Sequence, residues 1–107
     1  MMKKSVIYST SAGVEPYTEY VDSLRDRSGA AKIRLRVTFA ELGNLGDHKR
    51  IAHGVIELRI NYGPGYRVYA ALHGRELIVL LCAGDKGSQH KDAKKAVKYW
   101  EDFKKDL

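Results

Sequence analysis

Four residues around a Gly-Pro-Gly turn have the types and spacing to do chemistry. In the segment ELRINYGPGYRVYAAL, residues 57–72, polar side chains occupy alternate positions on both sides of the turn: Glu57, Arg59, Arg67 and Tyr69. If the two halves pair as a hairpin, these side chains share one face within cross-strand reach. Guanidinium groups fit phosphate oxygens, and a phenol can stack on a base or transfer a proton. We therefore expect a phosphate-contacting site, with an ordinary solvated sheet face as the alternative.

A second polar segment, GDKGSQ at 84–89, follows the last apolar run and leads into a helix. Lys86 in this segment supplies a positive charge that can stabilise negative charge developing in a reaction. A loop that enters a helix can also offer backbone N–H groups to an anion. The spacing does not match a Walker-type loop, and an ordinary strand-to-helix connection explains the segment better than an anion site does.

The remaining reactive side chains indicate neither a metal nor a cofactor. The four histidines are His48, His53, His73 and His90, and none has metal-ligand spacing. No Ser-His-Asp arrangement or paired-carboxylate motif is visible in the order of residues. Cys82 lies inside the apolar run ELIVLLCAG, so we expect it in the core. A site in this chain must then use arginine, lysine, tyrosine and glutamate.

The charge balance favours a polyanionic partner. Nineteen Lys and Arg residues against thirteen Asp and Glu residues give a net charge of +6 and a pI of about 9.5. A merely soluble protein with lysine-rich helices accounts for the same totals. The 107 residues suffice for one domain with a single core. No apolar run reaches the length of a membrane span or a signal-peptide core, so we expect a cytoplasmic protein without a membrane partner.

The first half of the chain predicts one strand and two helical segments, the second ambiguous. Residues 5–10 are typical of a strand, and a helix is expected from Pro16 to about Gly29. Residues 32–39 alternate apolar and polar side chains as a strand does, whereas their flanking residues favour a helix with apolar groups on two sides. The pattern alone leaves both alternatives open.

The second half predicts a basic loop, three strands and a helix. The loop covers 46–54, the strands are expected at 55–61, 66–72 and 77–83, and the helix begins near Ser88 as its cap. The helix has an apolar stripe made of Ala93, Ala96, Val97, Trp100 and Phe103. Together these elements predict an α+β domain, a small antiparallel sheet with its helices on one face.

The segment from Gly54 to Trp100 resembles the RelE/ParE toxin superfamily, and specifically its HigB-like addiction module killer proteins. In that branch E-L-R-I-x-Y-G-P-G-Y-R-V-Y-F precedes a G-G-D-K-S-T-Q loop and a C-terminal helix. The stretch LGNLGDHKRI also matches, so the resemblance covers essentially the whole chain, residues 1–107. Two positions depart from the pattern: Ala70 replaces a phenylalanine, and Gly87 lacks the hydroxyl found beside the lysine.

The resemblance implies a β-α-α-β-β-β-α fold, with two N-terminal helices on the sheet and residues 30–42 helical. It also implies a toxin of a type II toxin–antitoxin system that cleaves mRNA on the ribosome. The ribose 2′-OH would attack the adjacent phosphate without a metal ion. Arg67 would then be the main phosphate stabiliser, with Lys86 as a second positive group. Tyr69 or Glu57 would move protons, and Arg59 would orient the RNA backbone.

The implied RNA contacts are Lys49, Arg50, Tyr66, Gln89 and Lys91. The implied partners are mRNA, the ribosome and a cognate antitoxin, a small helix-turn-helix protein. Two other functions remain open at this point, because superfamily folds host more than one activity. One is ParE-like inhibition of DNA gyrase. The other is an inactive relic that only binds its antitoxin, an alternative that the departures at Ala70 and Gly87 keep open.

Overall fold

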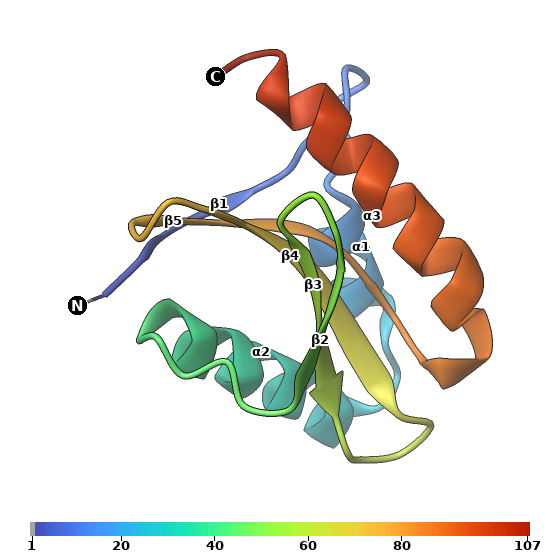
Figure 1. The fold of residues 1–107 in the computed structure, drawn as a ribbon. Coiled ribbons are helices and arrows are strands. Elements are labelled where there is room, and N and C mark those ends of the chain that lie inside the picture. Colours follow the sequence, from blue (N-terminus) through green and yellow to red (C-terminus); the bar gives the residue numbers. More distant parts are fainter. Residues whose placement is uncertain (1) are drawn as a thin grey trace.

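A five-stranded mixed sheet lies between two layers of helix in the computed structural model, which describes residues 2–107 (Figure 1). In chain order the elements are β1 (Lys4–Ile7), α1 (Pro16–Ser23), α2 (Arg27–Glu41), β2 (His48–Ala52), β3 (Val55–Ile60), β4 (Tyr66–His73), β5 (Leu77–Gly84), the 3-10 turn η1 (Lys86–Ser88) and α3 (Gln89–Lys104). The strand order is β1-β5-β4-β3-β2. β1 runs parallel to β5, and all other neighbours are antiparallel. The chain is an α+β protein, as predicted, but its sheet is mixed and has five strands, which corrects the expectation of a small antiparallel sheet.

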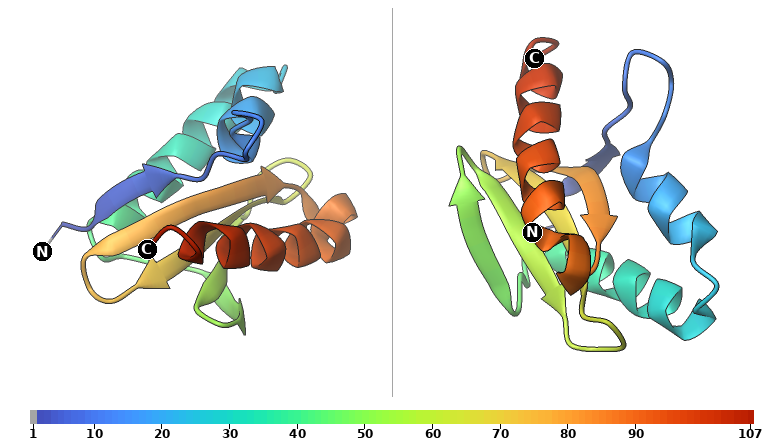
Figure 2. Two further views of the ribbon diagram at one scale, coloured as in Figure 1. Left: turned by 90° about the horizontal axis from the view of Figure 1, so that it is seen from above. Right: turned by 90° about the vertical axis from the view of Figure 1, so that its right-hand side faces the viewer.

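Helices cover both faces of the sheet, which corrects the expectation of one helical face and one core. Figure 2 shows α1 and α2 on one side of the sheet and α3 on the other. On the first side, Val21 and Ile33 pack with Leu58 in one buried cluster. On the second, Tyr69 and Trp100 belong to a separate cluster. The second core forms because β5 is apolar on both faces and α3 lays its apolar stripe across one of them.

The ambiguous segment is a helix, α2. Ile33, Val37 and Ala40 are buried at helical spacing in the core beneath the sheet. The helix begins earlier than expected, because the Asp26 carboxylate accepts a hydrogen bond from the Gly29 N–H at 2.9 Å and caps it at Arg27. Gly29 therefore does not end the preceding helix, which already stops at Ser23.

The predicted basic loop at 46–54 contains a strand, β2, which pairs with β3 at the edge of the sheet. The prediction was wrong because an edge strand can carry polar and charged side chains along its whole length. The sequence HKRIA therefore lacks the apolar alternation of an inner strand. His53, with a φ of 53°, and Gly54, with a φ of 90°, form the turn that joins β2 to β3.

The hairpin of β3 and β4 forms as expected. Glu57 lies opposite Tyr69, and Arg59 lies opposite Arg67. The turn between these strands needs left-handed backbone at Gly63 and Gly65, whose φ angles are 56° and 82°. The strand pairing therefore confirms the prediction that the four polar residues lie on one face of this hairpin.

The C-terminal helix is confirmed, but its capping differs from the prediction. Ser88 stands at the N-cap position of α3 without a capping hydrogen bond from its side chain. The Asp85 carboxylate instead accepts hydrogen bonds from the N–H groups of Gly87 (2.8 Å) and Ser88 (3.3 Å) at the start of η1. The capping residue is therefore Asp85, one short turn before Ser88, and the sequence pattern did not single it out.

Candidate functional site

Two rows of side chains cross the face of the sheet that α3 partly covers. Directly paired residues point to the same face, so the register places Lys49, Glu57, Tyr69 and Cys82 in one row across β2, β3, β4 and β5. The next row toward the Gly-Pro-Gly turn contains Arg59, Arg67 and Gly84. The structure thus brings the four predicted hairpin residues together on one face.

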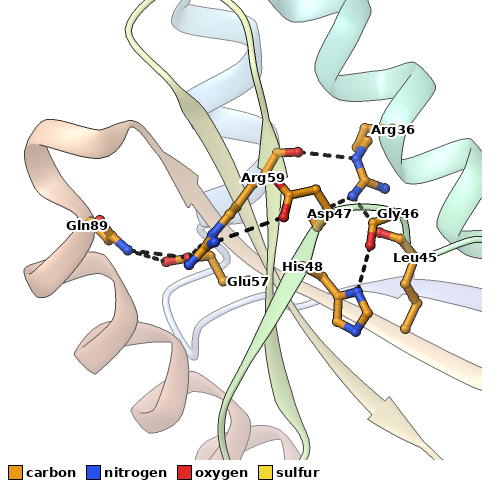
Figure 3. Close-up of polar contacts among 8 residues, drawn as sticks. All are labelled: Arg36, Leu45, Gly46, Asp47, His48, Glu57, Arg59 and Gln89. Atoms are coloured by element: carbon orange, nitrogen blue, oxygen red, sulfur yellow. Dashed lines mark hydrogen bonds and ion pairs between the residues drawn. The ribbon is translucent and has the colours of Figure 1, made fainter.

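Glu57 is the centre of the first row. The residue is only 1% exposed, and a buried carboxylate must be compensated by hydrogen bonds or charge. The Arg59 Nε donates to Oε1 at 3.1 Å, and the Tyr69 hydroxyl donates to Oε2 at 3.1 Å. The Gln89 amide nitrogen lies 3.3 and 3.1 Å from the two oxygens (Figure 3). Three side chains from three elements therefore hold this carboxylate in place.

Tyr69 is fully buried beneath the start of α3. Burial, followed by the charge of Glu57, raises the pKa of the Tyr69 phenol above its ordinary value. The phenol therefore stays protonated and serves as a donor to Glu57. This geometry suits Tyr69 as a residue that positions Glu57, rather than as one that reaches a substrate.

Cys82 continues the row and is buried, as the sequence predicts. Burial is the main cause that raises the pKa of its thiol to about 12. The thiol is therefore protonated at neutral pH, and it lies 3.7 Å from the Asp92 carbonyl oxygen. Cys82 is a core residue of this face and has none of the thiolate character that a nucleophile needs.

Arg59 links the row of Glu57 to the loop before β2. Besides its bond to Glu57, its Nη1 lies 4.0 Å from a carboxylate oxygen of Asp47. Its carbonyl oxygen accepts from the Arg36 Nε at 3.3 Å, and another nitrogen of Arg36 donates to the carbonyl oxygens of Leu45 and Asp47 (Figure 3). Arg36 on α2 thus fixes the main chain around Arg59 from the opposite side of the sheet.

Arg67 lies opposite Arg59 and has an unsatisfied donor. Its Nε is buried and has no hydrogen-bond partner among residues 2–107. Within those residues, no carboxylate oxygen lies within 4.0 Å of its guanidinium nitrogens. Arg59 already has the Glu57 carboxylate as its counter-charge at 3.1 Å, whereas Arg67 has no such partner among residues 2–107. Arg67 is therefore the cation of this row that can take up an anion, and a guanidinium fits the oxygens of a phosphate.

Lys86 lies near this pair, at the approach of η1 to the Gly-Pro-Gly turn. A Cβ built on Gly65 would lie 3.4 Å from the Lys86 Cβ, so the two segments pass close to each other. Lys86 is exposed. The N–H groups of Gly87 and Ser88 are already occupied by Asp85, so the expected backbone anion site at this loop is not available. The positive charge of the segment resides in the lysine side chain.

A pocket of about 210 Å³ opens between β2 and the first turn of α3. Its polar lining consists of Lys49, Arg50, Glu57, Gln89 and His90. The structure thus unites three predicted RNA contacts with the central carboxylate. His90 was absent from the predicted site, and the only signal for it is its place next to Gln89 in the first helical turn. Lys91 follows on this turn, exposed, without lining the pocket.

Tyr66 is separated from these residues. It belongs to the core on the side of α1 and α2, and its hydroxyl donates to the Asp26 carboxylate at 2.8 Å. Burial, together with this hydrogen bond, raises the pKa of Tyr66 to about 12. Its place in the apolar set of β4 was predicted from the alternation, and this place conflicts with the RNA contact that the resemblance implied.

Residues 2–107 contain neither a metal-ligand cluster nor a helix that could span a membrane. No group of three or more His, Cys, Asp or Glu residues in that range is arranged to hold a metal ion. Within the same residues, no helix has the length and apolar character needed to cross a membrane.

The fold and the cationic face define a basic α+β protein with a candidate anion-binding site on its sheet. No protein-family model matches the chain. An uncharacterised protein of Haemophilus influenzae is 41% identical to it over 80 residues, which are 75% of this chain and 81% of that protein. The chain belongs to the same family as this Haemophilus protein.

Proposed function

We propose that the chain is the toxin of a type II toxin–antitoxin system and cleaves mRNA on the ribosome. The observation that carries the proposal is the Arg59–Arg67 pair, in which the Arg67 Nε is buried without a partner among residues 2–107. The motif shared with HigB-like members of the RelE/ParE superfamily supports it, although β2 adds a strand to the order expected from that resemblance. The net charge of +6 also favours a nucleic-acid partner.

The reaction that fits these residues is attack of a ribose 2′-OH on the adjacent phosphate. The 2′ oxygen loses its proton and bonds to phosphorus, the bond from phosphorus to the 5′ oxygen breaks, and that oxygen takes up a proton. The products are a 2′,3′-cyclic phosphate and a 5′-OH. The phosphate gains negative charge on the way, so preorganised cations lower the barrier. Arg67 and Lys86 supply this charge, and Arg59 orients the phosphate.

Proton transfer is assigned to His90. Glu57 accepts hydrogen bonds from three side chains, so its two oxygens are already occupied by donors of the protein. Its role is to hold Arg59 in place. His90 lines the same pocket, and the two nitrogens of an imidazole can accept and donate a proton. Lys49, Arg50 and Lys91 contact the RNA backbone around the cleaved bond.

The test uses purified chain, programmed ribosomes and an end-labelled mRNA. We expect fragments that end in a 2′,3′-cyclic phosphate, and we expect one 2′-deoxy nucleotide at the cut to abolish cleavage there. His90→Ala should reduce the rate by about 100-fold, as is typical for a lost acid or base. His73→Ala is the matched control, since His73 is an exposed histidine at the end of β4.

Cleavage at the 2′-deoxy nucleotide would contradict the proposed chemistry. Intact mRNA together with inhibited DNA supercoiling by gyrase would replace the proposal with the ParE-like function. Intact mRNA and unaffected gyrase would leave a protein that only binds its antitoxin.

A further inference from the structure

A second pocket, away from the candidate site, opens at the edge of β5. Its volume is about 420 Å³, compared with about 210 Å³ for the pocket beside Glu57. β1 pairs with β5 only from Leu77 to Leu80, so the C-terminal half of β5 lies beyond the end of β1. α1 and α3, which lie on the two sides of the sheet, supply most of the pocket's walls there (Figure 2). A pocket of this volume can hold a small molecule.

A buried carboxylate lines this pocket. Asp92 is 8% exposed, and one of its oxygens accepts a hydrogen bond from the Ser88 hydroxyl. Its other oxygen, Oδ1, receives no hydrogen bond from residues 2–107. Lys95 also lines the pocket, but no cationic side chain in that part of the protein lies within 4.0 Å of Asp92. A buried carboxylate without a counter-charge favours a cationic ligand.

Two tyrosines face the same space. Tyr20 on α1 and Tyr99 on α3 line the pocket, and neither hydroxyl makes a hydrogen bond to residues 2–107. The Tyr99 ring is stacked on Tyr8, with 4.9 Å between the ring centres. Burial is the main cause that raises the pKa of both phenols, and the charge of Asp92 adds to it. Neutral phenol rings attract an ammonium group, and their oxygens can accept hydrogen bonds from it.

The acidic character continues outward from this pocket along α1. A neighbouring surface hollow shares Val14 and Glu19 with the pocket, and no Lys or Arg is among the residues that line it. Glu15 and Glu19 lie one helical turn apart on its wall. Asp22, the third acid there, is paired with Arg34 at 3.4 Å, whereas no cation among residues 2–107 lies within 4.0 Å of Glu19. A chain of net charge +6 thus carries a row of carboxylates that begins in a pocket.

This row decides between the classes of cationic ligand. A divalent metal ion needs several oxygen ligands that converge on one point, and residues 2–107 contain no such group of three or more. A zwitterion such as a free amino acid would bring its own carboxylate close to Asp92 and Glu19. A linear polyamine carries several ammonium groups joined by methylene chains. It can neutralise carboxylates at successive depths and lay its methylene groups against the tyrosine rings.

We propose that the pocket between α1, β5 and α3 binds a linear polyamine. One terminal ammonium group binds Asp92 beside Tyr20 and Tyr99, and the following ammonium groups lie along Glu19 and Glu15. None of these five residues belongs to the proposed cleavage site, so the proposal stands whether or not the chain cleaves RNA.

The experiment measures binding to the full chain by isothermal titration calorimetry, in low salt and after removal of nucleic acid. The probes are the triamine spermidine, 1,5-diaminopentane and free L-lysine, which is the same diamine with an added carboxylate. We expect spermidine to bind most tightly and 1,5-diaminopentane to bind at least about tenfold more tightly than L-lysine. Magnesium chloride serves as a competitor that supplies charge without methylene groups.

Variants locate the polyamine on the chain. Glu19→Lys should weaken spermidine by about tenfold or more. Glu76→Lys, at an exposed acid of the β4–β5 turn, changes the net charge equally and should leave the affinity within about twofold. Asp92→Asn should also weaken binding by about tenfold or more, with Asp106→Asn, at an exposed acid, as its control. Circular dichroism checks folding, and the exposed Glu19 keeps the test valid if Asp92→Asn does not fold.

Four results would overturn the proposal. No binding of spermidine at about millimolar concentration would show that the pocket does not take a polyamine. Equal affinities for L-lysine and 1,5-diaminopentane would assign the pocket to a zwitterion. Displacement of spermidine by an equal concentration of Mg²⁺ would assign the carboxylates to a metal ion. Equal effects of Glu19→Lys and Glu76→Lys would show that only the net charge matters. RNA cleavage is not measured in any of these assays, so their failure would leave the proposed nuclease function untouched.

Discussion

At the scale of single residues, the central feature is a buried carboxylate that organises its neighbours. Glu57 receives hydrogen bonds from Arg59, Tyr69 and Gln89 and is almost completely withdrawn from water. A charge in such a place is stable only while its donors remain. Arg59 is therefore held in one orientation beside Arg67. The Nε of Arg67 is a buried donor without a hydrogen-bond partner among residues 2–107.

The first prediction at this scale concerns Tyr69. Tyr69→Phe removes one donor from the buried carboxylate, so we expect the free energy of unfolding to fall by about 1–3 kcal/mol. Cleavage should also slow, because Glu57 and Arg59 are then less firmly positioned. Urea denaturation measures the first effect. Tyr99→Phe serves as the control, since its hydroxyl makes no hydrogen bond to residues 2–107, and its effect should stay within about 0.5 kcal/mol. Equal losses in both variants would contradict the role of Tyr69.

At the scale of elements, the site depends on how β5 meets α3. Gly84 ends β5 opposite Arg67, and a Cβ built on it would lie 1.9 Å from a carboxylate oxygen of Asp92 on α3. Asp92 is itself buried, and its carboxylate accepts a hydrogen bond from the Ser88 hydroxyl. The absence of a side chain at Gly84 therefore allows the first turn of α3 to settle onto the sheet and to bring Gln89 to Glu57.

Gly84→Ala tests this contact. The added methyl group forces Asp92 to move, so we expect a loss of about 1–3 kcal/mol in the free energy of unfolding. In the Gly84→Ala and Asp92→Ala double variant the clash is gone. Its loss should therefore be smaller than the sum of the two single losses. Strict additivity in urea denaturation would show that the two residues do not compete for this space.

The elements also show what the sequence could and could not predict. Alternation in 55–61 and 66–72 correctly predicted two strands and the face shared by Glu57, Arg59, Arg67 and Tyr69. It did not predict that α3 covers Glu57 and Tyr69, because packing between distant segments leaves no local pattern. The edge strand β2 was missed for a different reason. An edge strand faces solvent on one side and does not need alternating apolar residues, so its sequence has no strand pattern.

Helix α2 is a further case in which the local pattern was insufficient. Its strand-like alternation arises because Ile33 and Val37 face the core while Leu35 and Phe39 face outward, exposed. A helix covered on one side only would normally show polar residues in the outward positions. The outward apolar residues of α2 are therefore the reason why this segment matched both a strand and a helix.

At the scale of the whole molecule, the sheet separates two surfaces of different character. One side carries the two polar rows beside α3, and the other carries α1 and α2 with the exposed apolar residues Leu35 and Phe39. The sequence predicted a single core and therefore did not predict this division into two sides. We propose that the first surface binds and cleaves RNA. Because they are separate, the two surfaces can be altered independently by substitution.

The most direct test of the central claim is a primer-extension map of a reporter mRNA after brief induction of the chain in cells. The wild type is compared with Arg67→Ala and with Arg75→Ala, an exposed arginine in the β4–β5 turn at the other end of these strands. We predict discrete cuts within the translated region for the wild type and Arg75→Ala. With Arg67→Ala they should fall at least about 100-fold, as expected when charge stabilisation of the transition state is lost. Undiminished cuts with a folded Arg67→Ala chain would contradict the assignment of this face as the site of RNA cleavage.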